Sequence, residues 1–179
     1  MKLKTCNAIL GLAIILALFL HTGTMIVSLV TGWYNLFYCK LFAHIAAGLL
    51  IAHVLISLCV FFFSAQPGGF RYPRHNLSTV LQRFSALLML VLIHFHLRAY
   101  AHMATGEVLT QSQALFTAAL EGIFILSVFI HIAVSLVKAL VTLGLAGSFE
   151  SAGKLEKAVW VFCAIWAAAA LYGVLGFFL

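Results

Sequence analysis

The stretch from Leu81 to Arg98, LQRFSALLMLVLIHFHLR, is an apolar segment that carries two imidazoles, His94 and His96, near its end. Ionisable side chains at bilayer depth are costly, so they are candidate functional residues. Three other apolar segments of the chain each carry a histidine at a comparable depth. The sequence therefore directs the search for function to histidines inside predicted membrane spans.

The composition indicates an integral membrane protein. Of the 179 residues, 65% are hydrophobic and 8% are charged, whereas a soluble domain has roughly a quarter charged residues. We expect an all-α protein with a single transmembrane domain over residues 1–179, because there is no long polar stretch. The net charge of +6 is interpreted as a signal of orientation, since nucleic-acid binding needs a basic polar face.

Stretches without charged residues, bounded by proline and glycine, divide the chain into predicted membrane spans. No charged residue occurs between Lys4 and Lys40, and Gln66-Pro67-Gly68-Gly69 ends the second apolar run. A polar connection is expected from Ala146 to Lys157. The predicted helices cover about 7–30, 38–65, 77–103, 113–143 and 157–179.

Basic residues predict the orientation in the membrane. With five spans, one side receives eight basic residues and the other receives Lys40 and Arg98. Basic residues gather on the cytoplasmic side, so we expect a multi-pass protein of the inner (cytoplasmic) membrane. Its N-terminus is predicted to be cytoplasmic and its C-terminus to lie outside. The eight are Lys2, Lys4, Arg71, Arg74, Arg83, Lys138, Lys154 and Lys157.

Four histidines fall into two layers of depth. His53 and His131 are predicted roughly 18 Å from the cytoplasmic ends of their helices, and His21 and His96 roughly 21 and 28 Å. Two neutral imidazoles from facing helices can close both axial positions of a haem iron. The layers thus predict two haems in a bundle built from the first four helices.

Helical geometry alone does not decide whether His94 or His96 would face a haem. His94 and His96 are about 200° apart around a helix, so they cannot both face one haem. His44 is about 180° from His53 and faces elsewhere. His75 is in a loop.

Three other interpretations of these histidines have a physical basis. A buried histidine can simply hydrogen-bond a neighbouring helix, which would leave a haem-poor anchor that binds quinone. A di-iron site of the desaturase type needs clustered histidines near the cytoplasmic face. The one tight cluster, His94-Phe95-His96, is predicted deep in the membrane and far from that face. A proton-coupled carrier could also use buried His and Glu, although broken helices and inverted repeats are not evident.

The chain resembles the five-helix, di-haem cytochrome b subunit of succinate:quinone and quinol:fumarate oxidoreductases. The most specific part is LQRFSA at 81–86, followed by a histidine fourteen residues after Gln82. Ala52-His53-Val54 and Phe129-Ile130-His131 also match, and His21 matches by its position in the first helix. Ala86 stands where the family motif has glycine.

The resemblance implies roles and partners. His53 and His131 would ligate a proximal haem b, and His21 and His96, rather than His94, a distal haem b. A flavoprotein and an iron–sulfur protein would bind on the cytoplasmic side and complete a heterotrimer, which could pair into a dimer of heterotrimers. The expected quinone is menaquinone. This chain has neither a dinucleotide fingerprint nor iron–sulfur cysteine spacing, so its expected role is to carry electrons and react with quinone.

Polar residues near the haems are further candidates. Glu121 is predicted to exchange protons at a quinone site, or else to be held by the dipole at the start of its helix. His44 and Tyr38 are weaker quinone candidates. Side chains expected to contact haem propionates, unless they only snorkel or pack, are Gln82, Arg83 and Ser85 on the inner side and Arg98, His102 and Lys40 on the outer side.

Overall fold

The computed structural model describes residues 3–64, 73–106, 108–146 and 149–179, without the side chains of 64, 73–76, 102–104 and 149. Its helices are α1 (Leu3–Thr31), α2 (Leu36–Ser64), α3 (Pro73–Thr105), α4 (Gln111–Thr142) and α5 (Phe149–Phe178). All five are long and apolar enough to cross a membrane. The prediction of an all-α integral membrane protein is therefore confirmed.

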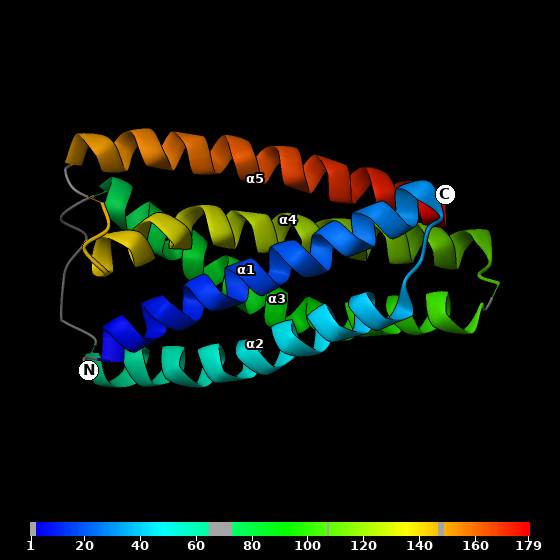
Figure 1. Cartoon of the computed structure of the whole chain (residues 1–179), viewed down its shortest axis with the longest axis horizontal. Helices are drawn as coiled ribbons and strands as arrows, with labels where there is room; N and C mark the ends of the chain where they lie inside the picture. The colour runs from blue at the N-terminus through cyan, green and yellow to red at the C-terminus, as the bar shows by residue number, and fades with distance from the viewer. Residues whose placement is uncertain (1–2, 65–72, 107, 147–148) are drawn as a thin grey trace.

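The helices run up and down beside one another (Figure 1). The amino terminus lies at the same end of the molecule as the start of α5, and the carboxyl terminus lies at the end where α1 passes into α2. Lys40 in the first turns of α2 and Arg98 in the last turns of α3 therefore lie at the carboxyl-terminal end. The basic residues near the start of α5 lie at the opposite end.

A glycine in the left-handed conformation follows three of the helices, at Gly32 after α1, Gly106 after α3 and Gly144 after α4. Gly32 follows α1 with φ of 70°, and Gly144 follows α4 with φ of 74°. Only glycine adopts this left-handed conformation without strain. Helix α1 ends at Thr31, one residue after its predicted end at 30, and α4 ends at Thr142, one residue before its predicted end at 143.

The expected polar connection up to Lys157 is wrong. Helix α5 begins at Phe149, and Glu150 and Lys154 form an i,i+4 ion pair of 2.8 Å on its surface. Such pairs support an exposed helical turn. The charged residues that suggested a loop lie in the solvent-facing first turns of α5.

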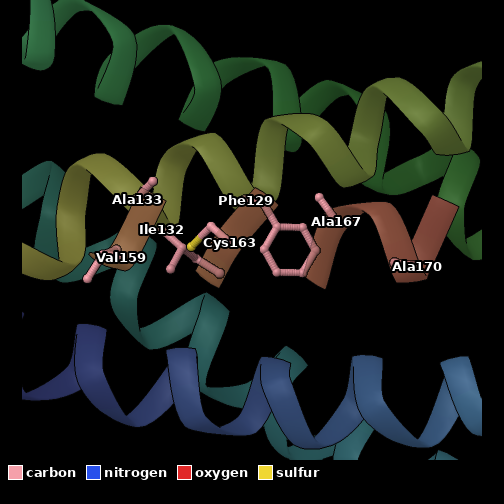
Figure 2. Close-up of a cluster of buried hydrophobic side chains, with 7 residues drawn as sticks. All are labelled: Phe129, Ile132, Ala133, Val159, Cys163, Ala167 and Ala170. Atoms are coloured by element: carbon pink, nitrogen blue, oxygen red, sulfur yellow. The ribbon is translucent and has the colours of Figure 1, made fainter. Parts of the chain in front are cut away.

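A cluster of buried hydrophobic residues joins α4 to α5, and α1 packs against it. Figure 2 shows it along the α4–α5 interface, formed by Phe129, Ile132, Ala133, Val159, Cys163, Ala167 and Ala170. Helix α1 adds Phe19, whose ring centroid is 5.1 Å from that of Trp166. Small residues allow helices to approach closely in a membrane. Helix α5, which carries no histidine, therefore braces the helices that do.

Helix α2 is held on one side only. Among the described residues, its Cα atoms come within 8 Å of α1 and of no other helix. A side-chain contact reaches α3, where the guanidinium of Arg83 lies 5.0 Å from the centroid of the Phe61 ring. The inner face of α2 thus has no closely packed backbone opposite it.

Candidate functional site

His21 on α1 and His96 on α3 face each other across the bundle. Their ring centroids are 6.2 Å apart, and the ring planes are inclined by 89°. Two imidazoles bound to opposite sides of one metal ion, each through a bond of about 2 Å, have centroids about 6 Å apart. The spacing of this pair therefore suits one metal ion between the rings.

Helix α4 fixes the ring of His96. Glu121 Oε2 lies 2.9 Å from His96 Nδ1, and the Phe124 ring is stacked on the imidazole with centroids 4.8 Å apart. With Nδ1 donating its proton to the carboxylate, Nε2 is left as the free, metal-binding nitrogen. This carboxylate–imidazole pair orients His96 as metal proteins commonly orient a histidine ligand.

His94 and His96 lie on different sides of α3 and differ in exposure. His96 is partly buried opposite His21, whereas His94 is exposed on the other side of α3. This is the arrangement that the family resemblance implied and that helical geometry alone left open.

His131 on α4 is held by α3. Its Nδ1 lies 3.0 Å from the backbone carbonyl oxygen of Gln82 and 3.2 Å from Ser85 Oγ. The Nδ1–H group therefore has an acceptor, and Nε2 is again free. Ser85, which we expected near a propionate, is buried and directed at this ring instead.

His53 on α2 belongs to the same level as His131. It is close enough to His131 for charges on the two rings to interact. A Cβ atom added to Gly11 of α1 would lie 3.7 Å from His53 Cε1, and Ser57 Oγ lies 3.5 Å from its Nε2. Of the two sequence-predicted pairs, His21 and His96 thus have neighbouring rings, and His53 lies within electrostatic range of His131.

Two ring nitrogens in these pairs lack partners within the described residues. Both His21 Nδ1 and His53 Nδ1 are buried without a hydrogen bond. Leaving such a group unsatisfied costs roughly 1–3 kcal/mol. Together with the open inner face of α2, these atoms fit residues that receive a group from outside the chain.

The number of ligands restricts the kind of metal group. In the described part of the chain, no cluster of three or more His, Cys, Asp or Glu side chains could hold a metal ion. A bare zinc site needs about four ligands. Two imidazoles per site suit a metal that brings its own equatorial ligands, as haem iron does.

Sequence reasoning missed one residue at the His131 level. Lys138 Nζ donates to Gln82 Oε1 at 2.9 Å, so a cation lies beside the residues that hold His131. Lys138 had been considered only for orientation. Its spacing, seven residues after His131, could have indicated it, because such residues share one helical face.

The remaining candidates are distributed over the surface. His44 is exposed, with Nδ1 2.7 Å from the backbone carbonyl oxygen of Lys40. Tyr38 is also exposed, and its ring stacks on Phe42 with centroids 6.3 Å apart. Arg83 and Arg98 are exposed. His75 was expected in a loop, which is wrong, because it lies in the first turn of α3. The side chains of His75 and His102 lie outside the described residues.

Glu121 is not a first-turn residue. Helix α4 begins at Gln111, so Glu121 lies beyond the turn in which the helix dipole is effective, and that interpretation is wrong. Glu121 is 4% exposed and lines a cavity of about 270 Å³ between α3 and α4. Its partner, His96, is 25 positions away in the sequence, which no local pattern indicates.

Comparisons with protein-family models, curated proteins and solved structures find no match to this chain. Function is therefore argued from the two histidine pairs and their surroundings.

Proposed function

We propose that this chain is the di-haem cytochrome b membrane subunit of a succinate:quinone or quinol:fumarate oxidoreductase. The observation that carries the proposal is the His21–His96 pair, with ring centroids 6.2 Å apart. The hydrogen bonds to Nδ1 of His96 and His131 support it, because each leaves Nε2 free for iron. Bound between two imidazoles, each haem would supply reversible one-electron transfer.

The residues of the chain would bind and orient the two haems. His53 and His131 would hold the proximal haem, and His21 and His96 would hold the distal haem. Lys138, Gln82 and Arg83 are the proposed propionate contacts at one end, and Arg98 at the other. Ser85 would hold the His131 ring.

The proposed complex has two further subunits. A flavoprotein and an iron–sulfur protein would dock on the cytoplasmic side, where the N-terminus is proposed to lie in the inner membrane. They would interconvert succinate and fumarate, and this chain would anchor them and exchange electrons with menaquinone. The complex would assemble as a heterotrimer or as a dimer of heterotrimers.

Glu121 is the proposed proton-exchanging residue at the quinone site. Its burial and its place on the cavity wall support this role. Replacing Glu121 by Gln is expected to abolish quinol oxidation while both haem spectra remain. Unchanged turnover would remove Glu121 from the reaction. His44, exposed on α2, stays a weaker candidate for quinone contact.

A visible spectrum of the purified chain tests the proposal. We expect the reduced protein to give low-spin b-type bands from about two haems per chain. His21→Ala and His96→Ala should each remove one haem, and His94→Ala, the matched control on the exposed side of α3, should remove none. Absence of a Soret band from membrane-purified protein would reject the proposal in favour of a haem-poor anchor or a proton-coupled carrier.

A further inference from the structure

Helices α1 and α2 meet at two successive turns beside His53. Asn7 and Gly11 are four residues apart on α1. Ser57 and His53 are four residues apart on α2, which runs in the opposite direction. Ser57 Oγ donates to Asn7 Oδ1 at 3.0 Å, and a Cβ atom added to Gly11 would lie 3.7 Å from His53 Cε1. Residues four apart share one helical face, so the hydrogen bond and the ring lie at the same interface.

The Ser57 hydroxyl lies beside both the amide and the imidazole. Its oxygen is 3.0 Å from Asn7 Oδ1 and 3.5 Å from His53 Nε2. A serine inside a helix commonly donates to the backbone carbonyl four residues before it, as Ser28 of α1 donates to the Thr24 carbonyl at 2.8 Å. Ser57 donates across the interface instead. Its proton therefore joins α2 to α1.

Helix α2 depends on α1 for its position. Among the described residues, its backbone closely approaches that of α1 and of no other helix. A second polar contact, between Ser28 Oγ and Cys39 Sγ at 3.7 Å, joins the two helices about 30 Å further along α1. Helix α1 also packs directly on α4, which carries His131. The place of His53 relative to His131 is therefore determined through α1.

We infer that the Asn7–Ser57 hydrogen bond positions His53, because it fixes the rotation and the register of α2 on α1. If α2 turned about its axis or slid along α1, this bond would break. The imidazole would then leave its place within electrostatic range of His131. Asn7 and Ser57 are thus positioning residues. The inference rests on the proposed function only for the haem between His53 and His131.

Histidine 15N NMR spectra of the full-length chain, purified in detergent, give a readout at the ring itself. The ring resonances of His53 are assigned by their absence from His53→Ala. We expect them to shift in Ser57→Ala and in Asn7→Leu, because either change removes the hydrogen bond one turn away. The resonances of His21 and His96, which lie on other helices, should stay where they are.

Haem retention in competition with a haem-scavenging apoprotein gives a second readout. Ser57→Ala and Asn7→Leu should each weaken the binding of one of the two haems roughly threefold or more, as expected for the loss of one hydrogen bond between membrane helices. The double variant should be no weaker than either single variant, because both changes remove the same bond. Ser57→Thr retains the hydroxyl and should behave as the unmodified chain does.

Ser28→Ala is the matched control, because it makes the same chemical change at the other polar contact between α1 and α2. It should alter neither the His53 resonances nor the retention of haem. Unshifted His53 resonances in Ser57→Ala, additive losses in the double variant, or an equal effect of Ser28→Ala would overturn the inference.

The two readouts separate this inference from the proposed function. Shifted His53 resonances in Ser57→Ala, in a chain that binds no haem, would retain the positioning role and reject the di-haem subunit. Two haems per chain with unshifted His53 resonances would retain the subunit and reject the positioning role.

Discussion

His131 Nδ1 on α4 lies 3.0 Å from the backbone carbonyl oxygen of Gln82 on α3. Because this acceptor belongs to the main chain, no side-chain substitution removes it. The orientation of the His131 ring is therefore a consequence of how α3 packs on α4. Ser85 Oγ, 3.2 Å from the same nitrogen, is a second partner rather than the sole one.

Ser85→Ala should consequently have a small effect. The backbone carbonyl of Gln82 still orients the ring, and the hydroxyl contact is expected to contribute about 1 kcal/mol or less. We expect two haems per chain and a slightly lower unfolding temperature in a thermal melt followed by circular dichroism. His131→Ala is the contrasting variant and should remove one haem. Loss of a haem in Ser85→Ala would mean that the hydroxyl, not the carbonyl, holds the ligand.

Glu121→Gln should retain both haems but raise the midpoint potential of one. The amide oxygen can still accept from His96 Nδ1, so the ring stays in place, whereas the negative charge that favours oxidised iron is removed. An upward shift on the order of 50 mV is expected, if the hydrogen bond loses about 1 kcal/mol of charge assistance. A potentiometric titration of the visible bands measures it. A shift in neither component would mean that His96, which Glu121 contacts, is not a haem ligand.

Much of the fold was predictable, because long apolar runs bounded by glycine, proline and charge specify membrane helices without reference to neighbours. The start of α5 was missed since Glu150 and Lys154 were interpreted as loop residues, when they are i,i+4 partners on an exposed turn. The pairing of the histidine levels followed from counting residues along each helix. Contacts such as His96 with Glu121 depend on how α3 is rotated against α4, and helical periodicity contains no information on that rotation.

Packing of α5 on α1 yields a prediction about stability. A Cβ atom added to Gly173 would lie 3.3 Å from Leu29 Cβ, whereas one added to Gly176, one turn along the same helix, would meet nothing within 4 Å. Gly173→Leu should destabilise the protein by roughly 1–3 kcal/mol through overpacking. Gly176→Leu should not lower stability. Thermal melts in the same detergent compare them, and equal melting temperatures would contradict the close α1–α5 contact.

Gly11 provides a way to disturb one histidine pair and leave the other intact. An added Cβ there would lie 3.7 Å from His53 Cε1, so alanine fits, but the longer side chain of Gly11→Leu reaches the imidazole. The ring must then turn or move with α2, which only α1 holds closely among the described helices. We expect Gly11→Leu to lose the haem proposed between His53 and His131 and to keep the one between His21 and His96.

The matched control for that substitution is on α2 itself. Gly48 has nothing within 4 Å of its added Cβ, so Gly48→Leu makes the same chemical change, with the same gain in helix propensity, while leaving the histidines untouched. Haem content and the reduced spectrum of both variants decide the matter. If Gly11→Leu and Gly48→Leu both retain two haems, or both lose one, then the contact between α1 and the His53 ring does not position that ligand, and the open inner face of α2 must accommodate the haem in another way.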